Sequence, residues 1–263
     1  MKLQTNLPSN KLYYGAWKHI FDMAAKQPIN VLISYPRSGK DWMRKIIYAT
    51  TGKKVAGRDD YNNNRNEYWG IADHFIENIA ETMLNRIHDF KPALLLRDPR
   101  DSALSEAYRR IFFNHATNKF TDSLLNNTID RAIESWGWLY DNYIDKCFLI
   151  QYEHICLYPE RTIKSFHEYF SSEITSDITK TIIALDLKCN YKLSETNGVI
   201  RDRRATVYEN NWMRYISNCK KWKYYDVFKQ KHNDRIFEVL GDRMQKLGYL
   251  YKDHDIVKWG VKI

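Results

Sequence analysis

Residues 29–42, INVLISYPRSGKDW, place an apolar β-rich run, a short turn and the start of a helix side by side. The run 29–35 predicts a strand, because it is rich in β-branched and apolar residues and lies between Pro28 and Pro36. Residues 41–50, DWMRKIIYAT, predict a helix. A strand, a tight turn and a helix open a βαβ unit, so this stretch predicts an α/β fold.

The rest of the chain continues the alternation of strands and helices. We predict strands at 70–75, 92–97 and 147–152, and helices at 76–88, from about 101, at 129–145 and at 159–170. The polar, turn-rich stretch 52–68 predicts a surface loop. We therefore expect residues 1–263 to form a single three-layer α/β domain, with a mainly parallel sheet flanked by helices.

The composition favours a folded protein with an anionic partner. The net charge is +9, and the basic residues are densest at 97–110 and 201–204 rather than in a tail, which favours a compact anion bound in a pocket. The four cysteines form no CxxC pair, which argues against a zinc site and for reduced thiols. The sequence shows no apolar signal segment or 18-residue apolar run, so we expect a cytoplasmic protein without a membrane partner.

The turn at residues 34–42 has the composition of a phosphate-binding loop. Backbone N–H groups at the start of the helix can converge on an anion, Gly39 permits a tight turn, and Arg37 and Lys40 add positive charge. A Walker A loop would have Gly in place of Ser34 and Ser or Thr in place of Asp41, so metal-dependent nucleotide chemistry is disfavoured. A basic turn without a ligand is the alternative.

A second anion-binding pattern follows the strand at 92–97. Arg97 ends this strand, and Ser105 lies about one turn into the next helix, so a guanidinium and a hydroxyl can converge on one dianion. In the alternative interpretation, Arg97 pairs with Asp98 or Asp101 and fastens the corner between strand and helix.

Both segments resemble the PAPS-dependent sulfotransferases, whose donor is 3′-phosphoadenosine-5′-phosphosulfate (PAPS). The phosphosulfate loop of that family reads roughly Tyr-Pro-(Lys/Arg)-Ser-Gly-Thr-Thr-Trp. Six positions agree here: Tyr35, Pro36, Arg37, Ser38, Gly39 and Trp42. Lys40 and Asp41 replace the two threonines. Residues 97–105 match nearly all of the family's 3′-phosphate motif, Arg-(Asp/Asn)-Pro-(Arg/Lys)-Asp-x-x-x-Ser.

The resemblance implies PAPS as co-substrate, adenosine 3′,5′-bisphosphate (PAP) as product, and no metal. The donor-binding residues that it implies are Arg37, Ser38, Gly39, Lys40, Asp41, Trp42, Arg97, Ser105, Arg203 and Arg204. Arg37 is expected to touch the sulfuryl group and Trp42 to lie near the adenine. Arg203 and Arg204 belong to the segment 199–217, which resembles a late Arg-Lys-Gly segment of the family with Trp212 as its Trp. That segment lacks the glycine, and a solvent-facing basic loop is the alternative.

His74 is the candidate general base among eight histidines. It ends the predicted strand 70–75, at the sheet edge where open α/β sheets bind ligands, and an imidazole suits proton removal near neutral pH. It also lies 23 residues before Arg97, as the catalytic His of the family does, whereas His88 is expected on a helix surface. The family's Lys-Thr before this His is replaced here, so Arg37 and Lys40 are expected to stabilise the leaving phosphate.

Asp41 and Asp73 are the candidate acceptor-binding residues. Carboxylates beside an anionic donor are unfavourable unless a positive group lies between them. We therefore expect a cationic small-molecule acceptor, an amine- or guanidinium-bearing natural product of the saxitoxin type, sulfated on a hydroxyl or amine by in-line displacement. In the alternative, both aspartates pair with neighbouring Arg or Lys residues.

Two other function classes are compatible with parts of the sequence. A P-loop nucleotide kinase would have the same arrangement of strand, turn and helix. A nucleotide- or polyanion-binding module could keep the donor site without catalysing a transfer. A nucleic-acid binder is disfavoured, because the sequence shows no basic strip with interleaved aromatic residues. The acceptor's identity and the oligomeric state are not readable from the sequence.

Overall fold

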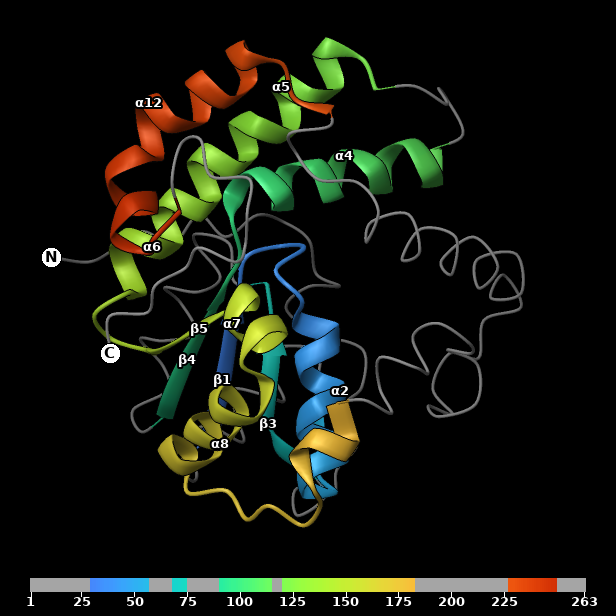
Figure 1. Cartoon of the computed structure of the whole chain (residues 1–263), viewed down its shortest axis with the longest axis vertical. Helices are drawn as coiled ribbons and strands as arrows, with labels where there is room; N and C mark the ends of the chain where they lie inside the picture. Colours follow the sequence, from blue (N-terminus) through green and yellow to red (C-terminus); the bar gives the residue numbers. More distant parts are fainter. Residues whose placement is uncertain (1–28, 57–67, 75–89, 115–119, 183–226, 250–263) are drawn as a thin grey trace, which may run out of the picture.

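The computed structural model describes residues 29–56, 68–74, 90–114, 120–182 and 227–249. Within these residues, five parallel strands form the central sheet (Figure 1). The strands are β1 (Ile29–Ser34), β2 (Lys54–Ala56), β3 (Tyr68–Asp73), β4 (Phe90–Leu96) and β5 (Phe148–Gln151). Their order is β2-β3-β1-β4-β5, and every neighbouring pair is parallel. The carboxyl ends of β1, β3 and β4 therefore meet at one edge of the sheet, where open α/β sheets bind ligands.

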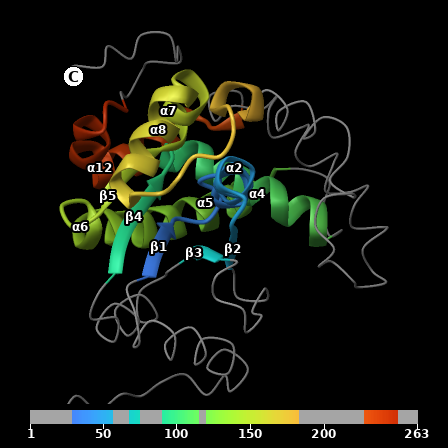
Figure 2. The ribbon, with the colours of Figure 1, turned by 90° about the horizontal axis from the view of Figure 1, so that it is seen from below.

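Helices cover both faces of the sheet. The helical segments are α2 (Lys40–Thr51), α4 (Pro99–Asn114), α5 (Asp122–Arg131), the π-helix η2 (Ala132–Trp136), α6 (Gly137–Tyr143), α7 (Tyr152–Leu157), α8 (Pro159–Phe170) and α12 (Gln230–Lys246). Seen along the strands, α2, α7 and α8 lie together on one side of the sheet (Figure 2).

Alternate strand residues build two separate hydrophobic cores. Val31 and Ile33 of β1 pack with buried residues of α5, α6 and α12, whereas Leu32 packs with buried residues of α2 and α8. This split follows from the alternation of side chains along a strand that is covered on both faces. The predicted three-layer α/β fold is thus confirmed.

Several predicted boundaries were wrong for identifiable reasons. β2 lies inside the stretch predicted as a loop, because three residues suffice to extend the sheet by pairing with β3. α4 begins at Pro99 rather than Asp101: Pro is favoured in the first turn of a helix, and the backbone carbonyl of Asp98 accepts the first helical hydrogen bond, from Ser102 N–H at 3.0 Å.

The helix predicted to begin at residue 129 begins at Asp122, where the side chain of Thr121 caps it by accepting from the N–H of Leu124 at 3.2 Å. α7, whose residues partly overlap the predicted strand 147–152, was not predicted as a helix. The predicted helix at 76–88 lies outside the described residues. No helix within the described part of the chain is long and apolar enough to cross a membrane.

Candidate active site

The turn between β1 and α2 has an unusual backbone. Arg37 has φ 70° and Gly39 has φ 93°, so two residues of this short turn lie in the left-handed region. At Gly39 a side chain is also excluded by space, since a Cβ atom would lie 2.5 Å from the ring of Tyr152. Holding a non-glycine residue at positive φ costs free energy, and such residues are typical of functional sites. The backbone of Arg37 therefore supports a functional role for the predicted phosphate-binding turn.

Ser38 provides a direct test of whether the turn fits a bound oxyanion. Its side chain is fully buried, and its hydroxyl has no hydrogen-bond partner among the described residues. A buried hydroxyl without a partner is costly, and most such groups in proteins are satisfied. A phosphate or sulfate oxygen in the turn would accept this hydrogen bond, so the donor predicted from the sequence fits the turn.

Arg37 joins the two predicted anion-binding segments. Its Nε donates a hydrogen bond to Oγ of Ser105 on α4, at 3.3 Å. This contact is possible because β1 and β4 are neighbours whose residues Ser34 and Leu95 are in register, so that both strands end at the same level. The sequence predicted the two segments separately, and the tertiary structure brings them into contact.

Glu106 adds a negative charge beside this pair. Burial by itself would raise the pKa of its carboxyl group, but hydrogen bonds from Arg109 and Arg110 and the positive charges of Arg109 and Arg37 lower that pKa overall. Glu106 therefore stays ionised and partly offsets the positive charge around Arg37.

Arg97, directly after β4, contacts an aromatic ring and a carboxylate. Its guanidinium lies over the ring of Tyr152, 4.6 Å from the ring centroid, and its Nη2 lies 3.5 Å from a carboxylate oxygen of Asp101. The ion pair that the sequence offered as an alternative is thus present. A guanidinium carries five N–H donors, so an ion pair with Asp101 is chemically compatible with a further contact to a phosphate.

His74 follows β3 directly and lies beside the end of β1. Its Nδ1 is 3.0 Å from the side-chain oxygen of Ser34 and 3.4 Å from the backbone oxygen of that residue. Ser34 is fully buried. Sequence reasoning noted Ser34 only as a missing Walker A glycine and missed its contact with the candidate base. The signal that could have found it is the parallel pairing of β1 with β3, which aligns Ile33 with Asp73.

Three other residues of the predicted site, Lys40, Asp41 and Trp42, lie at the start of α2. Lys40 and Trp42 lie in the first turn of α2, and Trp42 packs against Tyr152 with ring centroids 5.7 Å apart. The side chain of Asp41 is 62% exposed, and its carboxylate lies 3.6 Å from the guanidinium of Arg44. Asp41 therefore pairs with a neighbouring arginine, as in the alternative interpretation of the sequence.

The other residues named from the sequence lie at the end of β3 or outside the described residues. Asp73 ends β3, and only its backbone is described. Arg203, Arg204, Trp212 and His88 lie outside the described residues. The described part of the chain contains no group of three or more His, Cys, Asp or Glu side chains that could hold a metal ion.

Comparison with known proteins supports the architecture. No protein-family model matches the sequence, and no curated protein matches it significantly. Among solved structures, mouse sulfotransferase SULT7A1 complexed with PAP superimposes with a TM-score of 0.67 over 94% of this chain and 95% of that chain, at 14% sequence identity. The chain has a sulfotransferase fold.

A second sulfotransferase fold is more distant. The sulfotransferase domain of the olefin synthase from Synechococcus PCC 7002 matches 82% of this chain and 94% of that chain, with 10% identity and a TM-score of 0.42.

Proposed function

We propose that this protein transfers a sulfuryl group from PAPS to a hydroxyl or amine of a small-molecule acceptor. The observation that carries the proposal is the hydrogen bond from Arg37 to Ser105, which joins a 5′-phosphosulfate-type turn to a 3′-phosphate-type helix. The sulfotransferase fold supports it, and the mouse protein of the same fold binds PAP.

The proposed donor site contains two groups of residues. Ser38, Gly39 and Lys40 would hold the 5′-phosphosulfate, with Arg37 at the sulfuryl group. The buried hydroxyl of Ser38, which has no partner in the described part of the chain, supports this assignment. Arg97 and Ser105 would hold the 3′-phosphate. The sequence resemblance adds Asp41, Trp42, Arg203 and Arg204 to the proposal. PAPS supplies a sulfuryl group that is transferred by in-line displacement from a phosphate leaving group.

His74 is the proposed general base. The proposal takes the tautomer that is protonated on Nδ1, whose N–H can donate to the side-chain oxygen of Ser34 at 3.0 Å or to the backbone oxygen of that residue at 3.4 Å. In that tautomer Nε2 carries the lone pair and can take the proton of the acceptor hydroxyl or amine. Arg37 and Lys40 would stabilise the negative charge that develops on the leaving phosphate, so the proposal needs no metal.

A cationic acceptor remains part of the proposal, supported by one candidate carboxylate instead of two. Asp41 is exposed and paired with Arg44, so its charge is already offset. Asp73 ends β3 directly before His74, at the sheet edge where the acceptor should bind. The carboxylate that would attract an amine or guanidinium, as in saxitoxin-type molecules, is therefore Asp73.

Thermal unfolding with PAP, ADP and ATP, each with and without Mg²⁺, tests the donor class. A ligand that binds only the native state at about 100 times its Kd stabilises that state by about 2.7 kcal/mol. We expect PAP to raise the melting temperature without metal. Stabilisation by ATP only with Mg²⁺ would instead support a nucleotide kinase and refute the proposal.

Transfer of radiolabelled sulfate from PAPS to a panel of phenols, amines and guanidinium compounds tests the chemistry. We expect activity in the wild-type protein and its loss in His74→Ala. His154→Ala, at a half-buried histidine of α7, is the control and should keep the activity. PAP binding without transfer to any acceptor would favour a binding module. Undiminished transfer by His74→Ala would remove this residue from the mechanism.

A further inference from the structure

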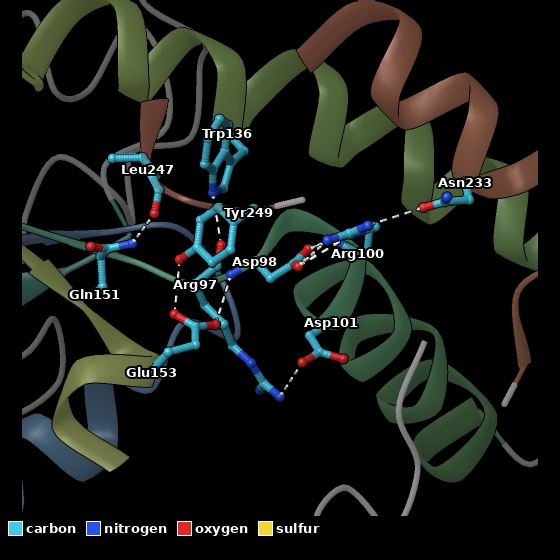
Figure 3. A network of polar contacts seen from close by, with 10 residues as sticks. All are labelled: Arg97, Asp98, Arg100, Asp101, Trp136, Gln151, Glu153, Asn233, Leu247 and Tyr249. Carbon is cyan, nitrogen blue, oxygen red and sulfur yellow. Dashed lines mark hydrogen bonds and ion pairs between the residues drawn. The ribbon is translucent and has the colours of Figure 1, made fainter. Parts of the chain in front are cut away.

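A single peptide group at the end of β4 is held on both sides. The carbonyl oxygen of Arg97 accepts a hydrogen bond from Nε1 of Trp136 at 3.0 Å, and the N–H of Asp98 donates to Oε1 of Glu153 at 3.0 Å. This carbonyl and this N–H belong to the same planar peptide unit. The two hydrogen bonds, drawn in Figure 3, therefore fix the orientation of the backbone from which the Arg97 side chain extends.

Trp136 makes its hydrogen bond from an unusual backbone. It ends the π-helix η2, it is fully buried, and it stacks on Tyr140 with ring centroids 5.5 Å apart. π-Helical turns are rare and often occur at functional sites. Here the turn lies in the helical run that contacts the carbonyl of a predicted phosphate-binding arginine.

Glu153 links the same peptide to the C-terminal segment. Its side chain is buried; one carboxyl oxygen accepts from the N–H of Asp98, and the other accepts from the hydroxyl of Tyr249 at 2.8 Å. Tyr249 is fully buried and follows α12. Next to it, the amide of Gln151 donates to the backbone oxygen of Leu247 at 2.9 Å.

A second connection ties α12 to the same corner. The carboxylate of Asp98 accepts from Nε and Nη2 of the buried Arg100, the shortest of these distances being 2.7 Å. Arg100 also donates to Oδ1 of Asn233 on α12 at 3.3 Å. Arg100 thus contacts protein groups in the interior, and the C-terminal part of the described chain reaches residues 97–98 along two routes.

We propose that Glu153 and Tyr249 are positioning residues for Arg97 and thereby set the preference of the site for a 3′-phosphorylated nucleotide. The inference rests on the proposed function, in which Arg97 binds the 3′-phosphate. The segment that holds the peptide also holds the guanidinium, because Tyr152, the chain neighbour of Glu153, lies under Arg97. A small rotation of this peptide moves the guanidinium away from the phosphate without changing the turn that holds the 5′ end.

The test compares the affinities for PAP and adenosine 5′-monophosphate by isothermal titration calorimetry. Tyr249→Phe removes one hydroxyl from the network and keeps the ring. Tyr143→Phe, at another buried tyrosine, is the matched control. We expect Tyr249→Phe to weaken PAP binding about tenfold, and binding of the monophosphate less than about twofold, because only PAP has a phosphate at Arg97. The control should leave both affinities unchanged.

Variants of Glu153 and Trp136 separate positioning from general destabilisation. Glu153→Gln keeps an oxygen that accepts from the N–H of Asp98, so it should retain the preference for PAP, whereas Glu153→Ala should lose it. Trp136→Phe removes the hydrogen bond on the other side of the peptide and should cause the same selective loss as Tyr249→Phe.

Two outcomes would refute this inference without refuting the proposed function. One is a preference for PAP that is unchanged in Tyr249→Phe and Trp136→Phe. The other is an equal loss of both nucleotides, which indicates a structural role. If the wild-type protein binds PAP no better than the monophosphate, the 3′-phosphate site itself fails, and the proposed function fails with it.

Discussion

Replacement of Glu153 by Gln should change how the stability of the protein depends on pH. Burial raises the pKa of this carboxyl group from 4.5 to about 7, despite the hydrogen bond from the Asp98 N–H and the nearby charge of Arg97, which both lower it. In the unfolded chain the group is solvated and ionises at its ordinary pKa. Between these two values the folded protein keeps a proton that the unfolded chain has lost.

The sign and size of the effect follow from this difference. The folded state binds more protons, so the contribution of Glu153 to stability is complete below about pH 4.5 and is lost as pH rises to about 7. At about 1.4 kcal/mol per pH unit, the wild-type protein should lose about 2 to 3 kcal/mol between about pH 5 and about pH 8 through this group. Glu153→Gln is neutral at every pH and should not show this loss.

Urea unfolding of the wild type and the variant over this pH range measures the effect. Other titrating groups contribute equally to both proteins, so they cancel in the difference between the two free energies of unfolding. Glu168→Gln, a replacement of an exposed glutamate on α8, is the matched control and should run parallel to the wild type. A difference between the wild type and Glu153→Gln that stays constant with pH would refute the reasoning.

Two further predictions concern the turn after β1. Gly39→Ala should lower the melting temperature and abolish PAP binding, because a Cβ atom would lie 2.5 Å from Tyr152. Gly52→Ala is also at positive φ, but no atom of the described residues lies within 4 Å of its Cβ position, so it should cost only about 1 kcal/mol and leave binding intact. Ser38→Ala should leave the stability of the nucleotide-free protein unchanged or slightly raised, since its hydroxyl has no partner within the described ranges, yet weaken PAP binding about tenfold by calorimetry. Normal PAP affinity in Gly39→Ala or Ser38→Ala would show that the turn does not bind the 5′ end.

Local patterns in the sequence predicted much of the architecture and part of the candidate site. The apolar runs at 29–35 and 92–97 predicted the strands β1 and β4, because continuous burial on both faces requires such runs. Gly39 and the charges around it predicted an anion-binding turn, since backbone conformation and charge act over a few residues. These features are local and therefore readable from one stretch of chain.

Contacts between distant segments were decided only by the tertiary structure. The hydrogen bond from Trp136 to the carbonyl of Arg97 spans 39 residues, and that from Tyr249 to Glu153 spans 96 residues. The approach of His74 to Ser34 depends on the pairing of β1 with β3. No periodicity or motif records which buried polar groups will face each other. Their partners are set when the packing of strands and helices removes them from water and leaves each donor only the acceptors within reach.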